Sequence, residues 1–460
     1  MAAPYPLIVA DFNLFVPNSG SMIAGFLLGG LGLTFGGVLI RRAIEHSPVL
    51  NRLAARIVGW RILVFLFTVL WFVPYYANAS DAMRYHGEGQ LVADLIRSGQ
   101  WDQIDWALGT RAMSDIIGLF YVPFGGNLYA MYLISALIGL AAALYFIKAF
   151  ALFQPARSAK SYALMLIFLP SFSMWSCVLG KDSLAALGLA LISYGYAIWL
   201  KGRHGRAVAH IVAGLIVVGV VRAHMALIGL VGAFVTEIVC TGAGARTTFQ
   251  GKMVRVVAIF AMLYLLVPVT RDFAAVDESS TTGVLNRMDV GTQGNQYGGS
   301  AVETQTISGP LALAKFFPVG VVRVLFQPFP WQANNPNSAL AALENLFILY
   351  LVLKKLKHLP RLFVGIRSRP YSCYCLIVAF ELLVLLGPTP NLGLLSRERA
   401  QLLPFFFAFL LTERFRPRLR RRFGEVWAPR SRSLDGVLEP LSQISVPQPQ
   451  SLDRAENLLP

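Results

Sequence analysis

The chain has 460 residues, of which 56% are hydrophobic and 14% are charged, and its formal net charge is +16. Soluble proteins carry about 25% charged residues, so this composition excludes an ordinary soluble protein. Many apolar stretches reach the roughly 20 residues that span a bilayer, and the sequence predicts an all-α, polytopic transmembrane helical bundle. The basic excess does not indicate a nucleic-acid partner, because the basic residues cluster after alternate apolar stretches.

Eleven stretches are apolar and long enough to be membrane spans. In chain order they are 22–40, 60–77, 127–147, 162–179, 183–200, 207–221, 225–240, 254–270, 337–353, 371–387 and 398–412. Residues 311–330 contain three prolines and two basic residues, which favours a re-entrant or interfacial segment over a span. No basic leader precedes the first apolar run, so no cleavable signal peptide is predicted.

The basic residues set the predicted orientation. Clusters of Lys and Arg follow the first, third, fifth, seventh and ninth predicted spans and open the C-terminal tail, as expected for the cytoplasmic side of a membrane. The N-terminus is therefore expected outside and the C-terminus in the cytoplasm, with outer segments 78–126, 271–336 and 388–397. Residues 1–412 form the predicted membrane domain. Residues 413–460 form a basic tail that is expected to be disordered, and the basic clusters also suit contact with anionic membrane lipids.

A polar stretch in the first outer segment separates two hydrophobic runs of the chain. Residues 79–101 read ASDAMRYHGEGQLVADLIRSGQW. Ser80 or Asp81 is suited to cap a helix that runs to about Ser98, and Arg84 and Glu88 are spaced to pair on one face. The apolar stripe is supplied by Leu91, Val92, Leu95 and Ile96. The pattern predicts an amphipathic helix on the outer surface of the membrane.

Asp81 is the main catalytic candidate in this stretch. A carboxylate at a helix start is stabilised as the anion by the helix dipole. It is suited to act as a general base on a sugar hydroxyl, or to bind a divalent metal or another cationic group. The alternative is that Asp81 only caps the helix.

Several basic residues remain on the predicted outer side, where the positive-inside bias disfavours them. They include Arg84, Arg287 and Arg323, and others at predicted helix ends: Lys181 beside Asp182, Arg222 near His224, and Arg397 and Arg399 around Glu398. Helix ends from distant parts of the chain can converge on one cavity, and Arg is well shaped to hold phosphate oxygens in pairs. The sequence therefore predicts a binding site for the phosphate or diphosphate of a lipid-linked sugar. The alternative is that each charge snorkels to the interface or pairs with a nearby carboxylate.

An aromatic stretch, QPFPWQANN, occupies residues 327–335. Trp331 and Phe329 are suited to anchor the chain at the membrane interface. Aromatic rings also stack on the faces of sugars, so Trp331 is a second candidate for substrate binding.

The sequence resembles the GT-C superfamily of membrane glycosyltransferases. The resemblance rests on SDAMRYHGEG, in which Asp81, Tyr85 and His86 occupy the first large outer loop. Four more stretches resemble membrane proteins of bacterial surface-polysaccharide synthesis: PSFSMWSCVLGKDSL, VRAHMAL, QPFPWQANN and LLSRERAQLLPF. Arg287 and Gly298 also have a spacing similar to that in outer loops of O-antigen polymerases. The resemblance implies that Asp81 is the catalytic base and that the donor is a sugar on a polyprenyl phosphate. A departure is that the tail of this chain is short and basic, where many GT-C enzymes have a large outer domain.

The expected function is sugar transfer on the outer face of a bacterial cytoplasmic membrane. The expected partners are a polyprenyl-linked sugar donor, a glycan acceptor, membrane lipids and other polysaccharide-assembly proteins. The close variant is a polymerase that transfers whole repeat units. The rival hypotheses are a transporter or flippase of lipid-linked glycans and a non-catalytic scaffold. The sequence contains no phosphate-binding P-loop, dinucleotide fingerprint or H-E-x-x-H motif.

Overall fold

The computed structural model describes residues 48–72, 81–240, 253, 256–257, 259–260, 310–333, 335–389 and 391–413. This part of the chain is helical and has no strand, in agreement with the predicted all-α class. The predicted span 22–40, most of 254–270, Arg287 and the tail from 414 onward lie outside the described residues.

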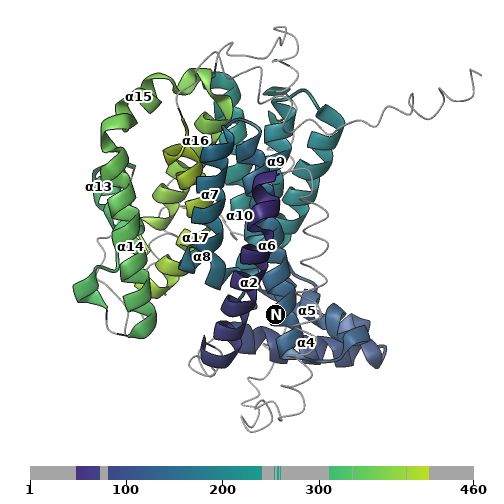
Figure 1. Cartoon of the computed structure of the whole chain (residues 1–460). Coiled ribbons are helices and arrows are strands. Elements are labelled where there is room, and N and C mark those ends of the chain that lie inside the picture. Colours follow the sequence, from purple (N-terminus) through teal and green to yellow (C-terminus); the bar gives the residue numbers. More distant parts are fainter. Residues whose placement is uncertain are drawn as a thin grey trace, which may run out of the picture. The chain divides into compact units, whose positions relative to one another are not determined.

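Among the described residues, three helices are long and apolar enough to cross a membrane, which indicates membrane association: α6 (Leu128–Ala151), α9 (Lys181–Trp199) and α10 (His204–Val239). The other principal helices are α2 (Pro48–Phe67), α4 (Asp81–Arg97), α5 (Thr110–Phe124), α7 (Ala156–Phe168), α8 (Pro170–Trp175), α13 (Pro310–Phe326), α14 (Pro336–Lys355), α15 (Leu359–Val364), α16 (Pro370–Leu386) and α17 (Leu392–Leu410). In Figure 1, α4 and α5 lie together at one end of these helices and α15 lies at the other.

The long helix α10 reverses its direction at Arg222. The backbone there has φ −151° and ψ 75°, which is not helical. Added Cβ atoms at Gly214 and at Gly229 would both lie within about 3 Å of Ile192 on α9. In a straight helix these two glycines would be about 22 Å apart, so the two halves of α10 must fold back on each other. The halves correspond to the separate spans predicted at 207–221 and 225–240.

The local structure of two other predicted segments depends on proline. The predicted span 162–179 is divided into α7 and α8, because Pro170 cannot donate a backbone hydrogen bond and Leu169 before it is extended. The segment 311–330, predicted to be re-entrant or interfacial, begins as a continuous helix, α13, which tolerates Pro318 in its interior. A turn with Pro330 follows it.

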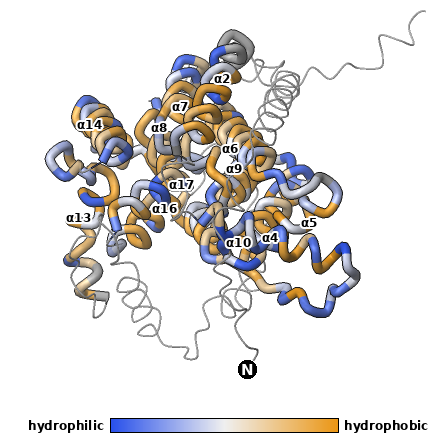
Figure 2. The backbone as a smooth tube through the Cα atoms, turned by 90° about the horizontal axis from the view of Figure 1, so that it is seen from below, coloured by the Kyte–Doolittle hydropathy of each residue, from blue (hydrophilic) through white to orange (hydrophobic). Residues whose placement is uncertain are grey.

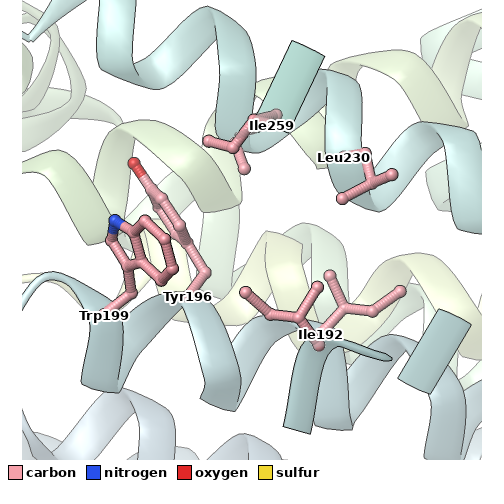
Figure 3. Close-up of a pocket in the computed structure, with 7 residues that line it drawn as sticks. Ile192, Tyr196, Trp199, Leu230 and Ile259 are labelled. Atoms are coloured by element: carbon pink, nitrogen blue, oxygen red, sulfur yellow. The ribbon is translucent and has the colours of Figure 1, made fainter. Parts of the chain in front are cut away.

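Glycines allow α9 and α10 to pack closely. A Cβ at Gly214 would lie 2.6 Å from the carbonyl oxygen of Gly188 and 2.8 Å from Cγ1 of Ile192. Small residues at helix crossings are typical of membrane proteins. Lipid tails are as apolar as the side chains, so the helices associate through close packing rather than through the hydrophobic effect. Further along, α9 and α10 enclose an apolar cavity of only about 10 Å³, bordered by Ile192, Tyr196 and Leu230 (Figure 3).

Replacement of Gly214 by Ala is expected to destabilise the protein by roughly 1–3 kcal/mol, because the new methyl group overlaps the backbone of α9. Gly219, on the same helix half, has no atom within 4 Å of its added Cβ. Gly219→Ala is therefore the matched control, with a change of at most about 1 kcal/mol in the favourable direction. Thermal unfolding in detergent measures both, and equal effects of the two substitutions would contradict the packing.

The helices α4 and α5 form an amphipathic pair. Figure 2 shows alternating hydrophilic and hydrophobic residues along α4, whereas α6 is mainly hydrophobic. A Cβ at Gly89 of α4 would lie 2.6 Å from Cγ2 of Ile117 on α5. The helix begins at Asp81 and ends at Arg97, close to the predicted bounds. Its packed face contains Tyr85, His86 and Ile96, whereas Leu91 of the predicted apolar stripe is exposed.

Candidate functional site

Asp182 is the centre of a buried charge cluster. Its carboxylate accepts hydrogen bonds from Arg222 Nη2 at 2.9 Å, from Gln401 Nε2 at 3.2 Å and from Arg397 Nε. The four residues come from α9, the reversal of α10 and α17. Because removal of a charge from water is costly unless the charge is paired, these contacts explain how Asp182 remains buried as the anion.

Local sequence places Asp182 and Arg397 where they meet. Asp182 is in the first turn of α9, where the helix dipole favours a carboxylate. Gly180 directly precedes this helix, and a Cβ there would lie 3.3 Å from Nη2 of Arg397. A methyl group at this position would therefore press on the end of the Arg397 side chain. At the start of α17, the Asn391 side chain accepts hydrogen bonds from Gly393 N and Leu394 N and fixes the beginning of the helix.

Arg397 joins Asp182 to Asp81. Its Nη1 donates to Asp81 Oδ2 at 2.8 Å, although the two residues are 316 positions apart in the chain. The guanidinium also lies over the ring of Trp175, at 5.9 Å from the centroid. The Asp81 side chain is 45% exposed and that of Asp182 is 4% exposed. Of the two carboxylates on Arg397, only Asp81 is therefore accessible to a substrate.

Lys181 and Arg222 complete the cluster of cations. Lys181 Nζ donates to Thr110 Oγ1 of α5 at 2.9 Å. Arg222 Nη1 lies 3.7 Å from Glu398 Oε1 and has no hydrogen-bond partner among the described residues. The backbone of Gly109 donates to Val220 O at 2.8 Å, which fastens the segment before α5 to the reversal of α10. His224 is exposed, two positions beyond Arg222.

The formal charges of this cluster cancel. We call it the Asp182 cluster, and its charged members are three cations and three carboxylates: Lys181, Arg222, Arg397, Asp81, Asp182 and Glu398. An additional anion is therefore accommodated best when it replaces one of the carboxylates. Asp81, the first residue of α4 and the most exposed of the three, is the one that can leave with the least rearrangement.

Arg399 does not join the Asp182 cluster, contrary to the prediction of one shared hollow. Residues two positions apart on a helix point about 200° apart, and Arg397 and Arg399 face opposite sides of α17. Arg399 is fully buried, with Nη2 at 3.5 Å from Glu344 Oε1 and Nη1 bonded to Asn345 Oδ1. Glu344 in turn accepts from the backbone N of Ser171 at 2.6 Å and from its hydroxyl at 2.5 Å. These contacts tie α17 to α14 and α8.

The other predicted substrate residues of α4 face in different directions. Arg84 pairs with Glu88 at 3.8 Å, as the spacing predicts, and lies over the ring of Tyr85. Tyr85 is buried and desolvation raises the pKa of its hydroxyl. His86 is also buried, and its Nδ1 is 2.7 Å from the hydroxyl of Tyr121 on α5. His86 therefore links α4 to α5, and neither Tyr85 nor His86 is exposed to a substrate in this structure.

Two further candidates lie near α13. Arg323 donates from Nη2 to Thr389 O at 3.0 Å and fixes the segment before α17. Trp331 is 79% exposed and stacks on Phe329, with 4.9 Å between ring centroids and 13° between planes. Asn345 Nδ2 donates to Pro328 O at 3.0 Å, so the loop that carries Trp331 is held in place. One face of the indole is covered and the ring is open to a ligand or to the membrane interface.

Sequence reasoning did not identify Glu398, Gln401, Glu344 or Asn345 as site residues. Glu398 stands between the two predicted arginines, and Gln401 is one turn from Arg397 on the same face. That spacing was a usable signal for Gln401. Glu344 is an acidic residue inside a predicted span, which is itself a signal of function or of a buried partner.

A divalent metal was an alternative ligand for Asp81. In the described part of the chain, no group of three or more His, Cys, Asp and Glu side chains is arranged to hold a metal ion. The neighbour of Asp81 is the Arg397 guanidinium. In this structure the cation beside the Asp81 carboxylate is therefore a side chain of the protein, Arg397.

No protein-family model, curated protein or solved structure matches the chain. The candidate function therefore rests on the residues and their geometry.

His86 is expected to make stability depend on pH. Burial lowers the pKa of its imidazole from 6.5 to about 4. Between these values the unfolded chain binds a proton that the folded protein does not, so stability falls as the pH drops from 6.5 toward 4. Between pH 7 and pH 5 the wild type should lose about 2 kcal/mol more than His86→Gln. Denaturant unfolding at both pH values measures this. Burial also raises the pKa of Asp115 to about 6. Asp115 is present in both proteins, so its contribution to the pH dependence cancels in the comparison. Parallel losses in the two proteins would contradict the buried neutral state of His86.

Proposed function

We propose that the protein is a membrane glycosyltransferase similar to the GT-C enzymes. It transfers a sugar or repeat unit from a polyprenyl-linked donor to a glycan acceptor, on the outer face of a bacterial cytoplasmic membrane. The observation that carries the proposal is the meeting of Asp81, Lys181, Arg222 and Arg397 around Asp182, although they belong to four separate helices. An exposed carboxylate beside several cations is the arrangement that displacement of a phosphate leaving group requires.

The proposed reaction is a direct displacement at the anomeric carbon of the donor sugar. The acceptor hydroxyl oxygen forms the new bond to this carbon, and the bond between the carbon and the phosphate oxygen breaks. Asp81 takes the hydroxyl proton. The negative charge that develops on the leaving phosphate or diphosphate is stabilised by Arg222, Arg397 and Lys181. Asp182 acts as a positioning residue, because it is buried and orients both arginines.

Binding of the donor and activation of Asp81 are coupled in this proposal. Arg397 Nη1 is bonded to Asp81 in the absence of a ligand. A phosphate oxygen takes the place of the Asp81 carboxylate on this nitrogen, and the released carboxylate is then free to accept a proton. The balanced charge of the Asp182 cluster supports this exchange, since an added anion favours the departure of one carboxylate.

The position of the cluster supports an outer-face site. Asp81 and Lys181 are the first residues of α4 and α9, and Arg222 is at the reversal of α10. The far end of α9 is followed by basic residues, Lys201 and Arg203. Because cytoplasmic ends are enriched in Lys and Arg, the cluster is assigned to the opposite side. The eleven-span topology is part of the same proposal.

The test is to incubate purified protein with a set of polyprenyl-linked sugars and candidate glycan acceptors. The expected result is a new glycosidic bond and release of polyprenyl phosphate or diphosphate, both detected by mass spectrometry. The same preparations in sealed vesicles report on the rival function. Movement of intact lipid-linked sugar across the bilayer, with no new glycosidic bond from any donor, would identify a flippase and reject the proposal.

A further inference from the structure

A groove lies between α7–α8 and α14, on the side of α17 that carries Arg399. Its volume is about 500 Å³, and its walls include Leu164, Phe168 and Pro170 on one side and Leu340, Leu343 and Phe347 on the other. This volume is within the range of pockets that bind small ligands, about 300–1,000 Å³. Of the nine residues that line it, Glu344 alone carries a charge.

The groove continues a lipid-like surface of α14. Leu343, Leu346, Tyr350 and Leu353 of this helix are exposed apolar or aromatic side chains. They recur at three- and four-residue intervals and form one stripe along the helix. Such a stripe is unfavourable in water and is expected in contact with the hydrocarbon of a membrane. The groove therefore opens from a face that is already suited to lipid.

The polar floor of the groove is neutral. Glu344 is only 5% exposed, and its carboxylate is occupied by Ser171 and by the Arg399 guanidinium. Among the described residues that line the groove none is a cation, so this lining has no group suited to hold a phosphate. Water is a poor occupant as well, because a bound water needs two to four polar partners and the walls are apolar.

We propose that this groove binds one acyl chain of a membrane phospholipid. The chain lies between α14 and α7–α8, and the phospholipid head remains at the membrane surface. The groove and the Asp182 cluster are on opposite sides of α17, since Arg399 faces the one and Arg397 the other. The occupant is accordingly a lipid other than the sugar donor. The bound chain keeps water away from the Glu344–Arg399 pair, which preserves the link between α14 and α17.

The inference is tested with a phospholipid that carries a photoreactive diazirine on its acyl chain. Purified full-length protein is irradiated with this lipid in nanodiscs, and the labelled residues are mapped by mass spectrometry. Leu343→Trp fills the groove, and Leu353→Trp is the matched control on the same helix. Leu343 is 65% exposed and Leu353 is 58% exposed, so both positions tolerate a larger apolar side chain in lipid. Labelling should concentrate on the groove residues and fall at least tenfold in Leu343→Trp, with little change in Leu353→Trp.

Three outcomes would overturn the proposal. Equal labelling along the whole stripe of α14 would mean ordinary surrounding lipid only. Unchanged labelling of the groove in Leu343→Trp would mean that the chain lies elsewhere. Displacement of the label by an equimolar polyprenyl phosphate would assign the groove to the sugar donor. The labelling experiment measures lipid binding and requires no sugar transfer. A negative result would therefore leave the proposed function unchanged, and a positive result would not depend on it.

Discussion

Asp81→Asn is expected to lower sugar transfer by about 10²- to 10⁴-fold, the usual contribution of a general base. Binding of the donor should persist or tighten. The reason is that Asp81 and the donor phosphate compete for Arg397 Nη1 in the proposed mechanism. The amide of Asn has nearly the size of the carboxylate but lacks its charge, so it competes less well. Transfer is measured as new glycosidic bond per time, and binding is measured with a labelled polyprenyl-linked sugar.

Asp94→Asn is the matched control for this substitution. Asp94 is on the same helix and is paired with Arg97 at 2.9 Å, but it is 72% exposed and far along α4 from the cluster. It should leave transfer and binding unchanged. Full activity of Asp81→Asn, with the protein present in the membrane in normal amount, would remove Asp81 from the mechanism. Loss of donor binding along with transfer would contradict the proposed competition between Asp81 and phosphate.

Asp182→Asn is expected to act on stability and on binding at once. Removing one charge from a buried ion pair leaves the partner uncompensated and costs about 3–5 kcal/mol. Asp182 has two arginine partners, and both lose their orientation when the carboxylate becomes an amide. Donor binding should therefore be lost at temperatures where the variant remains folded. Thermal unfolding in detergent and donor binding at low temperature measure the two effects separately.

The control for this effect is Asp105→Asn. Asp105 forms an ion pair with Arg111, but its side chain is 62% exposed, and exposed pairs contribute about 0–1 kcal/mol. The loss of stability should be small in Asp105→Asn and large in Asp182→Asn. Such a difference would arise from the burial of the Asp182 carboxylate. If Asp182→Asn were as stable as the wild type and bound the donor normally, Asp182 would not be the centre of the cluster.

The start of the candidate site could be predicted from the sequence because its signals are local. Asp81 begins α4, Arg84 pairs with Glu88, and Lys181 and Asp182 begin α9. Helix capping, i,i+4 spacing and charge at a helix end depend only on neighbouring residues. The convergence of these ends on one carboxylate depends on long-range packing. The expectation of a shared site came from membrane topology, which brings helix ends to one surface without fixing their order around it.

The error on Arg399 has a definite origin. The sequence pattern placed Arg397 and Arg399 together at the boundary between an outer loop at 388–397 and a span from 398, without the helical phase that separates their side chains. The helix in fact begins at Leu392, and its phase separates the two side chains. Asn391 was the available signal, because an Asn before a helical run is a common N-cap. The divided span at 162–179 has a similar origin, since Leu169 before Pro170 is disfavoured from helical geometry.

Two features of the chain meet in the Asp182 cluster. The reversal of α10 lies at Arg222, a member of the cluster, and Arg397 contacts both a buried and an exposed carboxylate. A purely structural ion-pair network would explain the buried contacts. It would not require the exposed Asp81, whose pairing with Arg397 contributes little stability when one partner is open to water.

The most direct test of the central claim is an experimental structure of the protein with a polyprenyl diphosphate sugar bound. The account predicts that phosphate oxygens lie within hydrogen-bond distance of Arg397 and Arg222, and that the Asp81 carboxylate has left Arg397 and faces the anomeric carbon. A structure in which the Asp81–Arg397 pair is intact and the phosphate binds elsewhere would contradict it.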